Sequence, residues 1–179
     1  LYHEELFGTE GFSSTSSLLY HLYPPTLVKE IGKPVNRRPV VALEDNLTCK
    51  SFMGYDVQPE PDYINSRKVF LFNDDMQIGM ACPSQSMDEY FFKNADADEM
   101  LFIHEGSGSC KTMYGSIDFE YGDYVIIPRG TVYKLQFNTR QNKILFVESN
   151  SPIKTPKRYR NEFGQLLEHS PFCERDFKL

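Results

Sequence analysis

One spacing of glycine and proline constrains the fold of this chain more than any other feature. Gly122 is followed by five residues, Pro128, one residue, Gly130, two residues and Tyr133. Tyr124–Ile127 precedes the proline as a short β-forming run, and Val132–Phe137 follows with alternating side-chain character. Glycine permits a tight turn, and a proline followed by a second glycine sets a bend. The spacing therefore predicts two strands that meet at the corner of a β-sandwich or barrel.

Short runs of β-forming residues fill most of the middle of the chain. Turn signals such as Asn73–Asp75 and Gly106–Gly108 separate runs at intervals of about eight to twelve residues, as in antiparallel sandwiches and barrels. The other runs are Val40–Leu43, Lys68–Phe72, Met76–Met80, Glu99–His104, Ser109–Tyr114, Ile117–Tyr121 and Ile144–Val147. These patterns predict a mainly all-β protein.

The flanking segments differ from this middle part in composition. The first 35 residues hold Gly, Ser and Pro with scattered aromatics, which indicates an extended arm rather than a helix. The residues after 150 are charged and proline-containing, with one short helix predicted near Glu162–Leu167. We therefore expect an arm over residues 1–38, a β-domain over 39–150 and an extended tail over 151–179.

The glycine–proline spacing is typical of cupins, which are jelly-roll β-sandwiches or barrels. Cupins use G-x5-P-x-G-x2-H as one motif, and a second motif of H-x-H, a Glu, six residues and a Gly. Glu99 and Gly106 fit the end of the second motif, but no histidine lies in the preceding residues 91–98. Tyr133 stands where the first motif has its metal-binding histidine. The sequence therefore predicts a cupin-like jelly roll that keeps its turn motifs and lacks the ligand histidines.

A divalent metal needs three or four ligands, and Glu99 is the one cupin ligand that this sequence retains. We therefore predict no catalytic, cofactor-binding or metal-binding residue in this chain. An alternative is a hard-cation site built from Asp96, Asp98 and Glu99, although a solvated turn is the simpler interpretation of these acids. If Glu99 points inward, its carboxylate requires a donor, with Tyr133 or a lysine as candidates.

Other catalytic patterns are missing from the sequence. His3, His21, His104 and His169 lie far apart, and His104 shares a strand face with Phe102, which favours a half-buried structural histidine over a ligand. No G-x-S-x-G elbow occurs, and Gly106–Gly108 is better explained as a turn than as a phosphate loop. The four cysteines, Cys49, Cys82, Cys110 and Cys173, form no CxxC pair, so we expect reduced, inert core thiols.

Charge and hydropathy bear on the partners of the protein. The net charge is −6, and no basic stripe interleaves with aromatics, which argues against nucleic acid and against an anionic membrane surface. Lys154, Lys157, Arg158 and Arg160 form the one basic cluster, interpreted as a solvated tail with an anion site as the alternative. No apolar run approaches the roughly 18 residues of a membrane span, so we expect a cytoplasmic protein.

Several long segments resemble homogentisate 1,2-dioxygenases and their bacterial relatives. The similar segments are Glu5–Phe12 (ELFGTEGF), Ser16–His21 (SSLLYH), Asn94–Gly106 (NADADEMLFIHEG) and Arg160–Asp176 (RNEFGQLLEHSPFCERD). The resemblance covers nearly the whole chain and its motifs are long.

The resemblance implies a function for the parent protein. Members of this family open the ring of homogentisate with O2 and mononuclear Fe(II), in the breakdown of tyrosine and phenylalanine. The resemblance places the iron ligands, two His and one Glu, in a second cupin-like domain towards the C-terminus, and implies trimers or larger oligomers. Because the chain opens at Leu1 and ends at Leu179, we expect an N-terminal part that supports the catalytic domain, with the arm wrapping a neighbour.

Two alternatives stay open from the residues. The first is a stand-alone, metal-free cupin module for oligomerisation or small-molecule binding. The second is a metal-free isomerase or epimerase that uses Glu99 and Tyr133 as acid and base.

Overall fold

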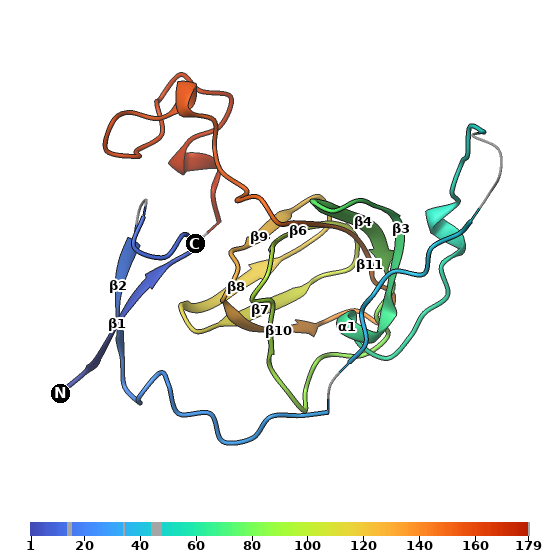
Figure 1. Ribbon diagram of the computed structural model, residues 1–179, viewed down its shortest axis with the longest axis horizontal. Coiled ribbons are helices and arrows are strands. Elements are labelled where there is room, and N and C mark those ends of the chain that lie inside the picture. The colour runs from blue at the N-terminus through green and yellow to red at the C-terminus, as the bar shows by residue number, and fades with distance from the viewer. Residues whose placement is uncertain (14–15, 34, 44–47, 179) are drawn as a thin grey trace.

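The computed structural model describes residues 1–13, 16–33, 35–43 and 48–178, and its centre is a sandwich of two antiparallel sheets (Figure 1). The five-stranded sheet has the order β3 (Arg67–Phe72), β4 (Met76–Ala81), β11 (Lys143–Ser149), β6 (Asp98–Glu105) and β9 (Tyr124–Ile127). The four-stranded sheet has the order β5 (Phe92–Lys93), β10 (Val132–Phe137), β7 (Gly108–Thr112) and β8 (Gly115–Phe119). The sheets face each other without closing into a barrel, so the fold is a cupin-like β-sandwich.

The core lies between the two sheets, where alternate residues of each strand point inward. Leu101 and Ile103 of β6 face Leu135 of β10, and all three side chains are buried. Because the alternation continues to the start of β6, Glu99 shares the inward face with Leu101 and Ile103. The same periodicity places a carboxylate inside the sandwich.

The turn motifs adopt the backbone that their glycines permit. Gly106, Gly122 and Gly130 have φ values of 105°, 91° and 82°, which side chains rarely tolerate. The Gly122 amide donates to the Ile103 carbonyl at 2.8 Å, which ties the β8–β9 turn to β6. The predicted corner between β9 and β10 is confirmed, as are all the predicted strands from residue 68 to residue 147.

The predicted strand at Val40–Leu43 is wrong. This segment is irregular, and Val40 and Leu43 are 95% and 91% exposed. The segment pairs with no described strand, and a β-forming run without a neighbour cannot satisfy its backbone hydrogen bonds in a sheet.

The predicted helix at Glu162–Leu167 is also wrong. Gly164 has a φ of 86°, and the Asn161 side chain accepts hydrogen bonds from the amides of Phe163 and Gln165. These local bonds compete with helical ones and produce a turn, closed by a bridge between Arg160 and Leu166.

In the part of the chain that the structure describes, helical structure is confined to single turns. These are η1 (Gly54–Asp56), α1 (Tyr63–Ser66), η2 (Lys157–Tyr159) and η3 (Glu174–Asp176). Asp62 caps α1 by accepting the Asn65 amide at 2.8 Å. Within the described ranges, no helix is long and apolar enough to cross a membrane.

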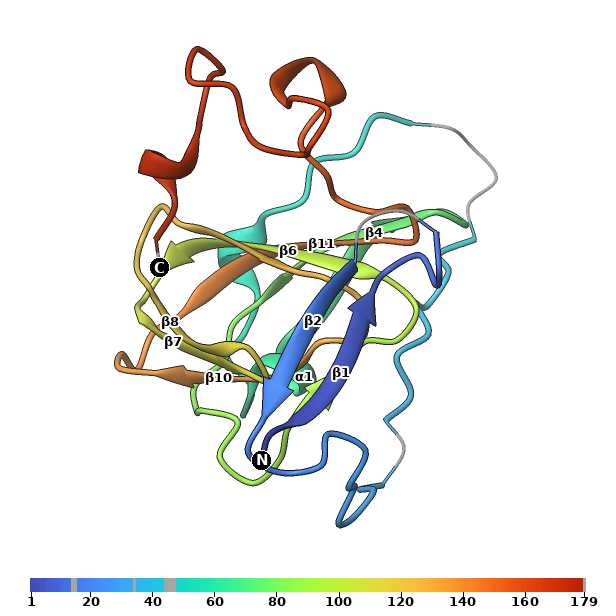
Figure 2. The same cartoon turned by 90° about the vertical axis from the view of Figure 1, so that its left-hand side faces the viewer.

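The N-terminal segment contains a hairpin rather than a fully extended arm. β1 (His3–Gly8) pairs antiparallel with β2 (Ser16–His21), and the hairpin lies beside the sandwich (Figure 2). Phe7 contacts Tyr114 edge-to-face at 5.3 Å, next to the β7–β8 turn. Residues 22–33 then run below the sandwich without regular secondary structure in the view of Figure 1.

Candidate functional site

A cluster of buried charged and phenolic side chains lies inside the sandwich, at the position of the retained cupin glutamate. We call it the interior cluster, and its members are Tyr63, Arg67, Glu99, Tyr133 and Glu148. The Arg67 Nη1 donates to Glu99 Oε1 at 3.0 Å, and the Tyr133 hydroxyl donates to Glu99 Oε2 at 2.7 Å. The Arg67 Nη2 donates to Glu148. Both Glu99 oxygens therefore have partners.

Strand register brings these side chains together. Glu99 of β6 and Glu148 of β11 are paired directly across the five-stranded sheet. Arg67 begins the β3 strand of the same sheet, and Tyr133 comes from β10 of the opposite sheet. The interior cluster thus links the two layers of the sandwich through hydrogen bonds and an ion-paired guanidinium.

Burial controls the protonation of the cluster. Glu99 is 1% exposed, and burial raises its pKa, opposed by Arg67 and by the Tyr133 hydrogen bond. Burial also raises the pKa of Tyr133 well above its ordinary value, so the phenol keeps its proton and acts as a donor. Burial opposes the charge of Arg67, but Tyr63, Glu99 and Glu148 together raise its pKa. Arg67 is a permanent cation at this site.

The interior cluster does not fit a divalent metal. Arg67 already supplies the positive charge beside the carboxylate, and its guanidinium also lies over the Phe146 ring at 4.2 Å. A metal at Glu99 would have to displace this cation and find further ligands. Among the described residues, no three His, Cys, Asp or Glu side chains lie close enough together to hold a metal ion. No Fe(II) chemistry is assigned to this cluster.

The expectation of a donor for Glu99 is confirmed for Tyr133, but the second donor is Arg67 and not a lysine. Arg67 and Glu148 escaped the sequence interpretation. The signal that could have found them is the period-two pattern of the strands. Arg67 is two residues from the half-buried Val69 and Glu148 is two residues from the buried Phe146, so each pair lies on the same face of the sheet. A charged residue on the inward-facing side of a strand predicts a buried partner of opposite charge.

The proposed cation ligands Asp96, Asp98 and Glu99 do not converge. Asp96 is exposed in a turn organised by Asn94, which fits the solvated-turn interpretation. That interpretation is wrong for Asp98 and Glu99, which are 3% and 1% exposed. Asp98 and Glu99 do not converge because successive side chains along β6 point to opposite faces of the sheet.

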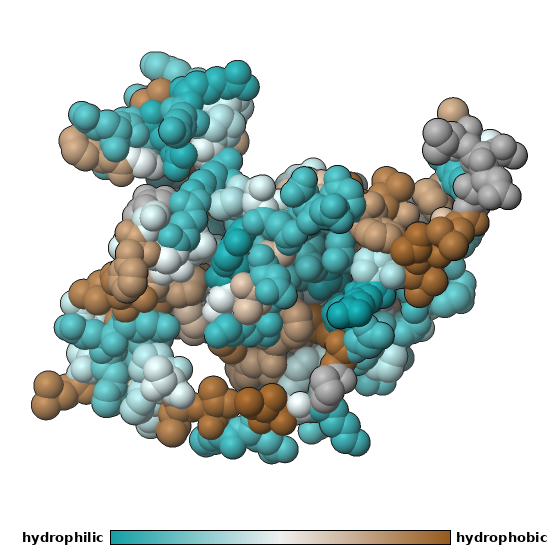
Figure 3. Space-filling model, viewed as in Figure 1, coloured by the Kyte–Doolittle hydropathy of each residue, from teal (hydrophilic) through white to brown (hydrophobic). Residues whose placement is uncertain are grey.

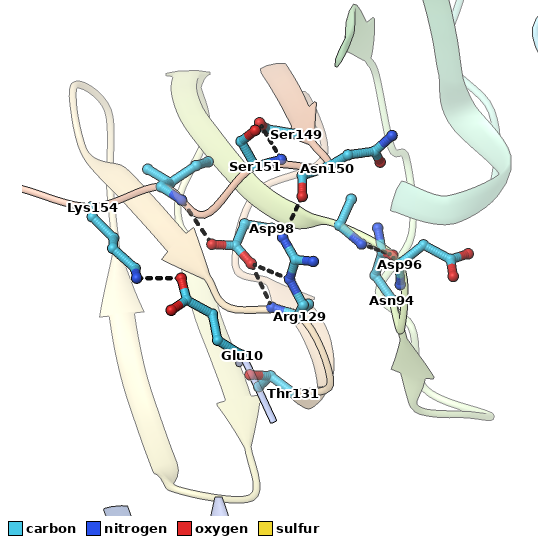
Figure 4. A network of polar contacts seen from close by, with 12 residues as sticks. Glu10, Asn94, Asp96, Asp98, Arg129, Thr131, Ser149, Asn150, Ser151 and Lys154 are labelled. Atoms are coloured by element: carbon cyan, nitrogen blue, oxygen red, sulfur yellow. Dashed lines mark hydrogen bonds and ion pairs between the residues drawn. The ribbon is translucent and has the colours of Figure 1, made fainter. Parts of the chain in front are cut away.

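Asp98 fastens three separate segments instead. Its carboxylate accepts hydrogen bonds from the Arg129 amide at 3.0 Å, the Arg129 Nε at 3.2 Å and the Ile153 amide at 2.8 Å (Figure 4). The Arg129 Nη2 donates to the Asn150 carbonyl at 2.7 Å. This Asp98 clasp joins the start of β6, the β9–β10 turn and the chain that leaves β11.

Two of the four histidines, His104 and His21, have structural partners, whereas His3 and His169 are exposed. His104 is half-buried, as predicted, and its Nε2 lies 2.6 Å from the Tyr55 hydroxyl. His21 pairs with Glu5 at 2.8 Å within the β1–β2 hairpin.

The cysteines follow the core prediction with one exception. Cys82, Cys110 and Cys173 are buried, and burial raises the pKa of Cys110 to about 12. Cys49 is exposed, so its assignment as a core thiol is wrong. It lies in the irregular segment 48–53, outside both sheets.

The basic cluster of the tail divides in two. Lys157 and Arg158 are exposed, and Lys154 pairs with Glu10, which follows β1 within the N-terminal hairpin (Figure 4). Arg160 is half-buried, and its Nε has no hydrogen-bond partner. The cluster is thus partly solvated and partly used to dock the hairpin.

Comparison with known proteins places this sandwich in a family. A protein from Saccharolobus solfataricus, provisionally named a dioxygenase, is 36% identical over 179 residues, which is all of this chain and 46% of that protein. The homogentisate 1,2-dioxygenase of Bradyrhizobium diazoefficiens is 36% identical over 64 residues, 34% of this chain and 14% of that enzyme. The chain therefore spans less than half of the length of these relatives.

A solved cupin-2 domain protein from Shewanella frigidimarina is 23% identical, with a TM-score of 0.42 over 47% of this chain and 79% of that one. The family model described as homogentisate 1,2-dioxygenase N-terminal matches residues 66–158, which form just over half of this chain and hold nearly all of the sandwich. The chain belongs to the homogentisate 1,2-dioxygenase N-terminal family.

Proposed function

We propose that this chain is the N-terminal part of an Fe(II)-dependent dioxygenase that cleaves the ring of homogentisate in the cytoplasm, in tyrosine and phenylalanine breakdown. The single observation that carries the proposal is the 36% identity, over the whole chain, with a longer protein named as a dioxygenase. The match to the homogentisate family model supports the substrate. In this proposal the iron is bound by residues outside these 179.

The role of this part in the proposal is structural, in support of a C-terminal catalytic domain and of assembly into a trimer or larger oligomer. The filled interior cluster supports it, because Glu99 has no free oxygen to offer an iron. Large apolar side chains are also exposed along the N-terminal segment, seen as brown atoms at the edge of the molecule in Figure 3. Such surface is typical of a contact with another part of a protein.

The test uses the full-length protein. Oxygen consumption with homogentisate and Fe(II) should be measured for the wild type and for Glu99→Gln, with iron content determined in both. We expect ring cleavage by the wild type, and unchanged iron content and turnover per folded molecule in the variant. Failure of the wild type to consume oxygen with homogentisate overturns the substrate, and loss of iron in the variant overturns the structural role of Glu99.

A stand-alone metal-free cupin module is the second candidate. The observation that favours it is Arg67, whose guanidinium holds the carboxylate that a cupin metal would otherwise bind. The two candidates differ in the reading frame: a gene that ends near codon 179 supports the module, and one that continues into a His- and Glu-bearing domain supports the dioxygenase.

The metal-free isomerase is supported least by the geometry. Glu99 and Tyr133 are hydrogen-bonded at 2.7 Å, as an acid–base pair requires, but they are 1% and 0% exposed. Both side chains are thus closed to a substrate, and Arg67 holds Glu99 and Glu148 through its two terminal nitrogens.

A further inference from the structure

A pocket of about 720 Å³ opens at the end of the sandwich, outside the interior cluster. One wall is the irregular chain 35–40, and the others are the α1–β3 junction and the residues that follow β5. Arg67 and Glu148 form the boundary between the pocket and the interior cluster. The volume is within the range of small-molecule sites.

The lining carries an excess of positive charge. Five cationic side chains line the pocket against two acidic ones, and the cations are Arg37, Arg38, Arg67, Lys68 and Lys93. Two of these charges are already neutralised, because Arg67 pairs with Glu99 and Glu148, and Lys68 pairs with Glu60 at 2.5 Å. Among the described residues, Arg37, Arg38 and Lys93 form no ion pair within 4 Å, although Glu99 attracts Arg37 from a greater distance. The protein as a whole is acidic, so this local excess runs against its overall charge.

Among the cations of the lining, Arg37 is the one with a buried nitrogen that has no hydrogen-bond partner. Its Nη2 donates to the Ile64 carbonyl, which fixes the guanidinium beside α1 in the pocket wall. Its Nε is buried without a hydrogen-bond partner. Burial and the neighbouring Arg67 both lower the pKa of Arg37, whereas the ion-paired Arg67 has its pKa raised. A partly buried guanidinium without an ion pair is costly, and an anion bound beside it in the pocket would offset part of that cost.

The other lining residues indicate the chemical character of the rest of the ligand. Val35, Ile64, Val69 and Phe92 provide apolar surface beside Arg37, and Asn65 and Asn94 add amide groups. A planar guanidinium matches a carboxylate with two parallel hydrogen bonds. Asp96 and Glu148 in the same lining would repel a doubly charged group such as phosphate.

We propose that this pocket binds a small monocarboxylate with a compact apolar or aromatic body, with Arg37 as the residue that binds the carboxylate. In this proposal the site is distinct from the iron centre of the parent protein, because no group of metal-ligating side chains is found among the described residues, the pocket lining included. Its occupancy does not depend on the proposed dioxygenase activity.

Isothermal titration of the full-length protein with benzoate tests the proposal. Benzamide serves as the neutral probe of the same shape, and inorganic phosphate as the dianion. Arg37→Gln removes the charge and keeps the size. Arg140→Gln is the matched control, because Arg140 is an exposed arginine on the β10–β11 turn that does not line the pocket.

We expect a benzoate site in the wild type that loses about tenfold or more in affinity in Arg37→Gln, as for a lost charge-assisted pair, and is unchanged in Arg140→Gln. Benzamide and phosphate should bind at least tenfold more weakly. Benzoate that binds only at an iron centre would be unaffected by Arg37→Gln, and this result overturns the proposal. If benzamide binds as tightly as benzoate, the site does not require a carboxylate. If phosphate binds as tightly, the site does not select a monoanion. If Arg37→Gln does not fold, Arg37→Lys replaces it. We then expect a partial loss of benzoate affinity, and an unchanged affinity contradicts the proposal.

Discussion

At the scale of single residues, the chain solves one problem in an uncommon way. A carboxylate inside a β-sandwich must be neutralised, and in a metal-binding cupin the ion does this. Here Arg67, with a side chain 4% exposed, is hydrogen-bonded to Glu99 and Glu148 and stacked on Phe146. Such a buried ion pair adds little net stability compared with apolar residues of similar size. Removal of one partner, however, strongly destabilises the fold, because it leaves the other charge buried and unpaired.

Arg67→Met should therefore destabilise the fold by about 3–5 kcal/mol, because it leaves Glu99 buried and unpaired. Glu99→Met alone should also destabilise, and the double variant should recover a large part of the loss. Urea unfolding of the four proteins gives the coupling energy. Additive effects, with no recovery in the double variant, contradict a shared ion pair.

Thiol reactivity is the second residue-scale prediction. In the native protein at pH 8, one thiol, Cys49, should react rapidly with a disulfide reagent, because it is the exposed cysteine among Cys49, Cys82, Cys110 and Cys173. The pKa of Cys110 is raised to about 12, so a change from pH 7 to pH 9 should leave it unreactive. Cys49→Ser should remove the rapid phase, whereas a rapid phase that survives in this variant contradicts the assignment.

At the scale of elements, two features hold the sandwich together: the close approach of β3 to β4, and the hydrogen bonds that fix the loops around Asp98. A Cβ atom on Gly79 of β4 would lie 2.0 Å from the Lys68 carbonyl oxygen of β3. The β3–β4 register shifts between Val69 and Leu71, next to this contact. The glycine thus allows β3 to approach, and β3 in turn carries Arg67 into the interior cluster.

Gly79→Ala should destabilise the protein by about 1–3 kcal/mol or more, because the methyl group meets backbone that cannot move aside cheaply. Gly32→Ala is the matched control, since nothing lies within 4 Å of its Cβ position. Thermal melting of both variants checks this. Equal melting temperatures would show that β3 can shift without loss.

The Asp98 clasp gives a local prediction. Asp98→Ala leaves the amides of Arg129 and Ile153 without their acceptor, at about 1–3 kcal/mol for each unsatisfied donor. Amide hydrogen exchange should speed up at these two residues, with little change at the centre of β6. Asp118→Ala, an exposed aspartate on β8, should leave the exchange at both amides unchanged.

At the scale of the whole molecule, the N-terminal hairpin presents two different faces. Phe7 and Leu19 are half-buried on the side that faces the sandwich, whereas Leu6, Leu18 and Tyr20 are 59%, 50% and 59% exposed on the other. A hairpin this short is marginal by itself, so an exposed apolar face supports the proposed role of the segment in assembly.

Leu6→Glu with Leu18→Glu should weaken the proposed oligomer of the full-length protein, measured by sedimentation, while each protomer stays folded. Ser116→Glu with Gln141→Glu adds the same two charges at exposed positions outside the hairpin and is the control. An oligomer that is unchanged in the double variant removes the hairpin from the assembly interface.

The sequence by itself determined the strands and corners, because period-two alternation and glycines with positive φ are local properties. The runs from Lys68 to Val147 and the corner at Gly122–Tyr133 follow from such patterns. Where a local pattern lacked a neighbour, as at Val40–Leu43, the prediction failed, since a strand depends on its partner.

Only the tertiary structure decided what neutralises Glu99. Arg67 lies 32 residues away along the chain, and it reaches Glu99 through the pairing of β3 with β4, β4 with β11 and β11 with β6. The unsatisfied Arg37 has the same origin, because burial depends on which distant segments cover a residue. Periodicity reports which face a side chain takes, and the packed sandwich decides what that side chain contacts.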